Sequence, residues 1–426
     1  MKTLFKNATI IPMTEDKYLF VGDMLIEDEK IIKIAQSIND TADHTINCEG
    51  KIILPAFVNC HTHLAMTLMR NYKDDTLDLF SWLSQIWPIE DKLVDEDIYH
   101  ASILGLGEMI KSGCTTFADM YFNTWETARA CTETGMRGII GLTFFGDENE
   151  SRRRIKELVP RLEDAIGDNN NLRIDAAVHA IYTCSPGTYS LCKEWAEDRG
   201  TYFNTHLSET KKEVEDSIKE FGLTPARLLD SLGVLNERTY LAHGVWLDEE
   251  EQDIISRRGS SIIHNPSSNC KLASGIAPVA TYKSKGINVA LGTDGASSNN
   301  NLNLLKEMNL ASMLSSVSTL TPSILSPYDI IKMATKDGAK ALGLDNKIGS
   351  LESGKEADFI VLDMNKLNTT PTNDPFSAIV FSLDRSNIEY VYSRGKALLD
   401  KGLLTTIDED KAIRNTYRQW NDILKR

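Results

Sequence analysis

Residues 56–63 read AFVNCHTH, an apolar stretch that ends in two histidines separated by one residue. It is the first of eight short apolar segments, which alternate with longer amphipathic ones such as DEDIYHASILGLGEMIKSG at 95–113. The other seven apolar segments are 115–121, 137–145, 173–182, 201–209, 239–245, 260–268 and 288–296. Apolar strands alternating with helices indicate an α/β fold with a parallel sheet, and eight repeats predict a (β/α)8 TIM-type barrel. A doubly wound sheet is the alternative, but it would need a glycine-rich phosphate loop after the first strand, which NCHTHLAMT does not provide.

The two ends of the chain have a different pattern. Residues 1–55 and 356–426 contain short alternating segments such as TLFKNATII and ADFIVLDM, separated by turn residues. This pattern is typical of β-strands, and a final segment, DEDKAIRNTYRQWNDILKR, predicts a helix. We expect both ends to pair in one small β-sandwich domain, with the barrel of residues 56–355 inserted between them.

Charge and composition narrow the classes of partner. Sixty-one acidic and 46 basic side chains give a formal charge of −15, whereas a nucleic-acid-binding surface needs clustered Lys and Arg. The seven cysteines include no C-x-x-C pair, which favours reduced thiols. The N-terminal residues lack a signal-peptide core, and no stretch is apolar over the length of a membrane helix. We expect a cytoplasmic protein that binds neither nucleic acid nor a membrane.

Histidines concentrate at the ends of the predicted strands. Six of the eight lie at or near such an end, and Asp294 ends the eighth strand. The six are His61, His63, His179, His206, His243 and His264. In a barrel these ends meet at one rim, where active sites are assembled. His44 and His100 lie away from the predicted rim and are interpreted as structural, whereas His264 fits a structural and a functional role equally well.

Imidazole and carboxylate groups at one rim are the ligands of a divalent zinc or iron site. His61 and His63 face the same way because strand side chains alternate with period two. His206 lies across the barrel, and Asp294 can ligate the ion or accept a proton from water. Such a site leaves one position for water, whose pKa the ion lowers toward neutrality. Glu209 follows His206 by three residues and faces the pocket mouth, where a carboxylic acid can pass a proton to a leaving nitrogen.

Several motifs together resemble one family. The motifs are PAFVNCHTHLAMT (55–67), THLSE (205–209), LAHGV (241–245), HNPSSNCKLASGIAPV (264–279) and LGTDGASSNN (291–300). They are similar to those of the amidohydrolase superfamily, in particular its 5-methylthioadenosine/S-adenosylhomocysteine deaminases. The resemblance extends over nearly the whole chain, including GSLESGKEADFIVLD at 349–363. It implies that a metal-activated water attacks C6 of an adenosine-type substrate and releases ammonia and an inosine derivative.

The resemblance also implies roles for individual residues. One divalent ion per subunit, zinc in the first place and iron as the alternative, would be held by His61, His63, His206 and Asp294. The catalytic residues would be Glu209, His243 and Asp294, with Glu209 the proton shuttle. The substrate contacts would be Glu90, Arg154, His179, Glu209 and Asp294, with Glu90 on the ribose hydroxyls. The fourth strand lacks the lysine of a binuclear site, which favours one ion.

The substrate itself stays open. Arg154 is favoured over Arg152 and Arg153 as the substrate contact, and GIIGLTFFG at 138–146 lacks the second arginine expected from the resemblance. Methylthioadenosine, adenosine and S-adenosylhomocysteine therefore all remain candidates. A related hydrolase of guanine, cytosine or a triazine is the second hypothesis. A non-enzymatic scaffold is the third, although retention of all four ligands argues against it. The sequence leaves open whether the protein is a homo-oligomer.

Overall fold

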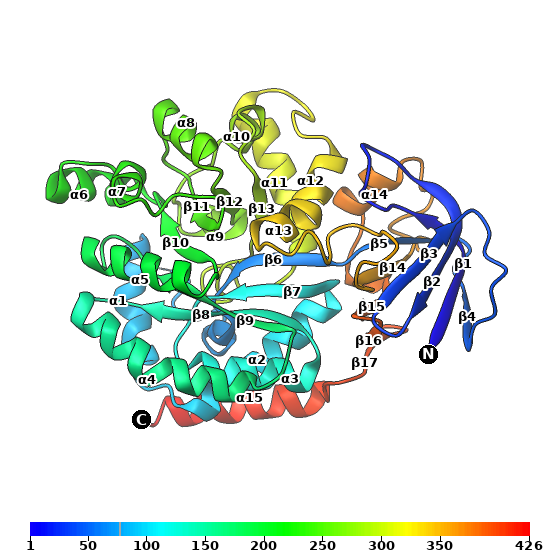
Figure 1. The fold of residues 1–426 in the computed structure, drawn as a ribbon, viewed down its shortest axis with the longest axis horizontal. Coiled ribbons are helices and arrows are strands. Elements are labelled where there is room, and N and C mark those ends of the chain that lie inside the picture. Colours follow the sequence, from blue (N-terminus) through cyan, green and yellow to red (C-terminus); the bar gives the residue numbers. More distant parts are fainter. Residues whose placement is uncertain (76–77) are drawn as a thin grey trace.

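The computed structural model describes residues 1–75 and 78–426, and its central feature is an eight-stranded parallel sheet (Figure 1). The strands lie side by side in chain order. They are β6 (Phe57–Thr62), β7 (Cys114–Asp119), β8 (Arg137–Phe144), β9 (Leu172–Val178), β10 (Phe203–Leu207), β11 (Thr239–His243), β12 (Ser261–His264) and β13 (Val289–Leu291). Each of the eight predicted segments overlaps one of these strands, and the predicted barrel is confirmed.

The first and last strands approach each other through hydrogen bonds near the rim. The Asp294 backbone N–H donates to the His61 carbonyl at 3.0 Å. The Asn59 side chain accepts from the Thr293 N–H at 3.0 Å and donates to the Thr293 hydroxyl at 2.8 Å. These bonds fix the distance between β6 and β13 at the point where two predicted metal ligands lie.

The interior of the barrel is filled by apolar side chains from six strands. They are Val58, Ala118, Ile139, Tyr240, Ile263 and Ala290. Because strand side chains alternate between the two faces, neighbours such as Phe57, Phe117, Ile140 and Ile262 face the surrounding helices and belong to the larger outer core. Burial on both faces explains why these strands read as continuous apolar runs.

Helices follow most strands and cover the outside of the barrel (Figure 1). They are α1 (Leu79–Glu90), α2 (Asp95–Lys111), α3 (Thr124–Thr134), α4 (Glu148–Ile166), α5 (Pro186–Asp198), α6 (Lys211–Phe221), α7 (Pro225–Ser231), α8 (Glu249–Arg258), α9 (Pro266–Lys271), α10 (Val279–Ser284), α11 (Leu304–Thr319), α12 (Pro327–Ala334), α13 (Lys336–Ala341), α14 (Pro375–Phe381) and α15 (Glu409–Ile423), with 3-10 turns η1 (Leu64–Met69) and η2 (Arg385–Asn387). Local sequence sets their ends. Asp248 and Glu251 form a reciprocal capping box before α8, and Gly259 ends that helix at a φ of +76°.

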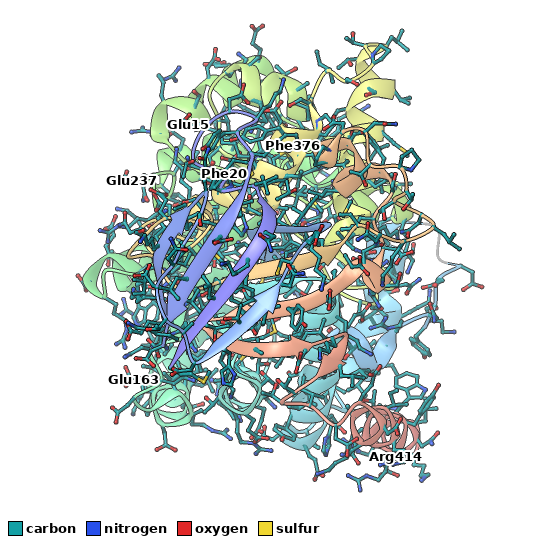
Figure 2. All side chains as sticks on the ribbon, turned by 90° about the vertical axis from the view of Figure 1, so that its right-hand side faces the viewer. Glu15, Phe20, Glu163, Glu237, Phe376 and Arg414 are labelled. Carbon is teal, nitrogen blue, oxygen red and sulfur yellow. The ribbon has the colours of Figure 1, made fainter. Side chains whose placement is uncertain are left out.

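Strands from both ends of the chain form a second, nine-stranded sheet, at the right of Figure 1 and facing the viewer in Figure 2. They are β1 (Lys2–Ile10), β2 (Phe20–Glu27), β3 (Lys30–Ala35), β4 (His44–Asn47), β5 (Lys51–Pro55), β14 (Phe359–Asp363), β15 (Ile388–Ser393), β16 (Lys396–Asp400) and β17 (Leu403–Leu404). The N-terminal β5 pairs antiparallel with the C-terminal β14, so the expected pairing of the two ends is confirmed.

The central strands of this sheet are buried on both faces. Ile53 and Phe359 point into a small core of the sheet's own, where Phe5 packs edge-on against Phe359 with ring centroids 5.0 Å apart. Their neighbours Leu54 and Ile360 belong to the outer core of the barrel. Period-two alternation therefore attaches the terminal sheet to the barrel along β5 and β14.

The C-terminal helix α15 lies along the barrel and away from the terminal sheet. In Figure 1 it runs beneath α2 and α3, and Arg414 marks it at the lower edge of Figure 2. Its Ile423 is fully buried in a cluster with Trp82 and Ile86 of α1, and Trp420 packs against Tyr72 with ring centroids 5.3 Å apart. In the part of the chain that the structure describes, no helix has the length and apolar character to cross a membrane.

Candidate active site

Three imidazoles and one carboxylate meet at the carboxyl ends of β6, β10 and β13. The Nε2 atom of His206 lies 3.2 Å from Nε2 of His61 and 3.3 Å from Nε2 of His63. Asp294 Oδ1 lies 3.4 Å from His61 Nε2 and 3.1 Å from His63 Nε2. The structure thus brings together the four residues predicted as metal ligands.

This arrangement fits a divalent ion. Donor atoms held about 2.0–2.1 Å from a tetrahedral ion lie roughly 3.3 Å from one another, which is close to the separations observed. The His63 Nδ1 faces the Met120 carbonyl, and the His206 Nδ1 faces the His179 carbonyl at 2.7 Å. Because a carbonyl only accepts, each Nδ1 carries the proton and each Nε2 presents a lone pair. A cation between these lone pairs and the carboxylate offsets their mutual repulsion.

The charge of Asp294 is fixed by its neighbours. Burial alone would raise the pKa of this carboxyl, but the adjacent imidazoles of His61 and His63 hold it well below its usual range. The second carboxylate oxygen, Oδ2, accepts hydroxyl hydrogen bonds from Ser268 at 2.6 Å and Ser298 at 3.0 Å. Asp294 is therefore an oriented carboxylate with Oδ1 directed at the histidines.

A second group, Glu209 and His243, lies beside the metal-binding residues. Glu209 Oε2 is 3.7 Å from His243 Nε2, and Glu209 Oε1 accepts a hydrogen bond from the Ser274 hydroxyl at 3.1 Å. Burial raises the pKa of the Glu209 carboxyl. His243 Nδ1 faces the Asn269 amide oxygen at 2.8 Å, so Nδ1 carries the proton and Nε2 is free to accept one.

The backbone is unusual at His243, at Asp294 and at Ser208, the residue that precedes Glu209. Ser208, His243 and Asp294 all have positive φ angles, of 47°, 75° and 60°. Such angles are uncommon for residues other than glycine and concentrate at functional sites. At the end of β11 the angle accompanies a change of direction: Leu241, two residues earlier, belongs to the outer core, whereas His243 lines the cavity.

A cavity opens over this group, and residues from α1 and from the strand ends line it. Glu90, at the end of α1, lines it and accepts a hydrogen bond from the Tyr121 hydroxyl at 2.7 Å, and burial raises the pKa of the Glu90 carboxyl. His179 lines it as well, with Nδ1 2.8 Å from the Thr183 hydroxyl. Burial lowers the pKa of His179 to about 3, so the ring is neutral.

Other predicted residues lie elsewhere. Arg154 stands beside the cavity, where its Nε donates to the Thr143 carbonyl at 2.8 Å, whereas Arg153 pairs with exposed helix carboxylates. His264 is buried but outside the metal-binding group, because it alternates with Ile263, which faces the barrel interior. Sequence reasoning did not single out Ser268, Asn269, Ser274 or Ser298, although three of them lie in the segment HNPSSNCKLASGIAPV.

The fold and the site together define a (β/α)8-barrel enzyme with a His/His/His/Asp group that could hold a divalent ion at the carboxyl ends of its strands. Residues 52–398 match the amidohydrolase family. The chain belongs to this family, in the group that includes the 5-methylthioadenosine/S-adenosylhomocysteine deaminases, as the motifs predicted.

Two relatives show the range of names in this group. A 5-methylthioadenosine/S-adenosylhomocysteine deaminase of Syntrophomonas wolfei is 41% identical, over 97% of this chain and 97% of its own. A 5'-deoxyadenosine deaminase of Methanobrevibacter smithii is also 41% identical, over 96% of this chain and 95% of its own.

Solved structures are similar to this one along the whole chain. An adenosine deaminase from Xanthomonas campestris with bound zinc has a TM-score of 0.94 and 29% identity, covering 100% of this chain and 99% of that one. The zinc-bound atrazine chlorohydrolase TrzN of Arthrobacter aurescens has a TM-score of 0.91 at 24% identity, covering 98% and 100% of the two chains. The second likeness concerns the fold alone.

Proposed function

We propose that this protein is a hydrolytic deaminase that converts a 5'-substituted adenosine and water into the inosine derivative and ammonia. The observation that carries the proposal is the His/His/His/Asp group beside the Glu209–His243 pair, within one cavity. Similarity to deaminases of methylthioadenosine, S-adenosylhomocysteine and 5'-deoxyadenosine, each about 41% identical, gives the class of substrate.

His61, His63, His206 and Asp294 would hold one divalent ion, for which we propose zinc. When bound, the ion lowers the pKa of water toward neutrality and supplies the nucleophile for attack on C6. His243 Nε2 and Asp294 take the proton that water loses. Both acceptors are in the required form, because Asp294 is ionised and the Nε2 lone pair of His243 is free.

Glu209 would deliver a proton to the purine ring as water adds at C6. Its raised pKa lets this carboxyl hold a proton at higher pH than an exposed glutamate. The proton that water loses would pass to the C6 amino group, which leaves as ammonia, so the two protons of water end on ammonia and on the ring nitrogen. Glu90 lies on another wall of the cavity, where it would accept hydrogen bonds from ribose hydroxyls. His179, which also lines the cavity, would contact the substrate. Arg154 would act on the substrate from behind the Phe145 ring.

Deamination of adenosine derivatives, followed as the change in purine ultraviolet absorbance and as released ammonia, tests the proposal. His206→Ala should lose both metal and activity, whereas His44→Ala, at an exposed histidine of the terminal sheet, should lose neither. Glu209→Gln should retain metal but lower kcat roughly 10²- to 10⁴-fold, with exposed Glu215→Gln as its control. Full turnover by Glu209→Gln would contradict the proton-transfer role, and no turnover of any adenosine derivative would contradict the proposed function.

A further inference from the structure

The cavity has two chemically different ends. Its inner end contains the metal-binding residues with Glu209 and His243, and its outer end is walled by aromatic and aliphatic side chains. The two relatives described above differ in the 5' group that their names specify, although they are equally similar to this chain. The outer end of the cavity is the part that would contact this 5' group.

Aromatic rings trace one wall from the inner end to the outer end. On one side, Tyr121 lies 6.4 Å from the ring of His63, and Phe122 lies 5.3 Å from Tyr121. On the other side, Phe145 lies 4.9 Å from His179, whose ring is 4.9 Å from a metal-binding histidine. Phe122 and Phe145 stack on each other, with centroids 5.3 Å apart and ring planes 16° apart. This stacked pair is therefore one ring removed from the metal ligands on both sides.

Helix α1 supplies the opposing apolar surface. Its cavity-lining residues are Leu79, Trp82, Leu83 and Trp87, followed by Glu90 at the end of the helix. Tyr182 also lines the cavity, and Phe80 of α1 packs edge-on against it with ring centroids 5.3 Å apart. The apolar lining of the outer end thus has two parts, one from α1 and one from the loops after β7, β8 and β9.

No cation opposes this wall: among the described residues that line the cavity, none is a lysine or an arginine. Arg154 lies behind Phe145, with its guanidinium carbon 5.8 Å from the centre of that ring. Its Nε is bonded to the Thr143 carbonyl, and Nη1 lies 3.7 Å from Glu150. A carboxylate at the outer end of the cavity would meet aromatic faces, and Lys212 Nζ, 5.2 Å from the centre of the Phe80 ring, is not among the lining residues.

We propose that the stacked pair of Phe122 and Phe145 selects substrates with a small apolar 5' substituent, namely 5'-deoxyadenosine and methylthioadenosine, over S-adenosylhomocysteine. The inference rests on the proposed function. In an adenosine the C6 amino group and the 5' carbon lie at opposite ends of the molecule, so placing C6 at the metal directs the 5' substituent outward. A methyl or methylthio group gains by burial against the rings, whereas the homocysteine ammonium and carboxylate would lose water without gaining partners.

The test compares kcat/KM for 5'-deoxyadenosine, methylthioadenosine, adenosine and S-adenosylhomocysteine with the metal-loaded enzyme. We expect kcat/KM for the two apolar substrates to exceed that for S-adenosylhomocysteine at least tenfold. The value for adenosine should lie between those of the apolar substrates and that of S-adenosylhomocysteine. Equal or faster turnover of S-adenosylhomocysteine would overturn the inference while leaving the deaminase proposal intact. Absence of turnover with all four would overturn both.

Variants at Phe145 test whether the stacked pair of Phe122 and Phe145 determines the substrate selectivity. The side chain is only half-buried, so a longer polar chain can be accommodated. Phe145→Arg should reduce the ratio of methylthioadenosine to S-adenosylhomocysteine at least tenfold, whereas Phe145→Leu should keep the preference for methylthioadenosine. Phe381→Arg, at an exposed aromatic residue of α14, should leave the ratio unchanged. An unchanged ratio in folded Phe145→Arg would refute the role of the ring pair, and the wild-type ratio alone decides the proposal if that variant does not fold.

Discussion

Asn269 offers the sharpest test of the proton-transfer geometry. Its amide oxygen lies 2.8 Å from His243 Nδ1, and each of the two residues is 1% exposed. Asn269→Leu keeps the size of the side chain but removes the acceptor, which leaves a buried Nδ1–H unpaired. An unpaired buried donor costs about 1–3 kcal/mol. If the ring turns to find another partner, that energy is lost from the transition state, and kcat falls roughly 5- to 150-fold.

The assay separates this effect from a general loss of structure. Asn269→Leu should retain its metal content and KM, because the ligands His61, His63, His206 and Asp294 do not depend on the amide. Asn269→Asp keeps an acceptor oxygen at the same place and should recover much of kcat. Wild-type kcat in Asn269→Leu, or equal loss in both variants, would refute the view that Asn269 sets the proton position on His243.

Three further predictions concern stability and metal. Arg137→Met removes the partner of buried Glu356 and Asp358 at the end of the barrel opposite the active site. In urea unfolding it should lower the unfolding free energy by about 3–5 kcal/mol, whereas the control Arg153→Met, at an exposed arginine, should lower it by about 1 kcal/mol or less. Equal urea midpoints for the two variants would contradict this prediction. Burial is the main cause that raises the pKa of Glu213 from 4.5 to about 7. The unfolding free energy should therefore fall by about 3 kcal/mol as pH rises from 4.5 to 7. Glu213→Gln should flatten this pH dependence, and parallel stability curves for the variant and the wild type would rule the prediction out. Chelation should abolish activity and lower Tm, with zinc restoring both; activity that survives complete metal removal would exclude a metal-dependent reaction.

The barrel could be predicted because its signal is local and repeated. Each strand is buried on both faces, so each leaves a continuous apolar run such as RGIIGLTF, and all eight of its residues are buried in β8. The ends of the strands were predicted less well: the segment predicted to run to residue 182 forms a strand that ends at Val178. Histidine is rare enough in this chain for its uneven placement to mark the rim, but the direction of a single side chain was not readable, as His264 shows.

The supporting residues could not have been found in the same way. Ser268, Asn269 and Ser298 are residue types common in any loop, and only the folded chain places them on Asp294 and His243. The position of α15 was equally hidden. The sequence predicts the helix, but its partners, α2 and the cluster around Trp82, lie about 300 residues or more earlier in the chain.

The division of labour between Asp294 and Glu209 follows from one physical contrast. Both carboxyls are buried within the same cavity, so burial raises the pKa of each. Asp294 also lies beside two imidazoles and accepts hydrogen bonds from two hydroxyls, and these neighbours outweigh burial and keep it ionised. Glu209 has one hydroxyl partner, Ser274, and the nearby charge of Asp294 further disfavours its ionised form. Two carboxyls whose pKa values are driven apart provide a base and an acid at one pH, as addition of water and departure of ammonia at a single carbon require.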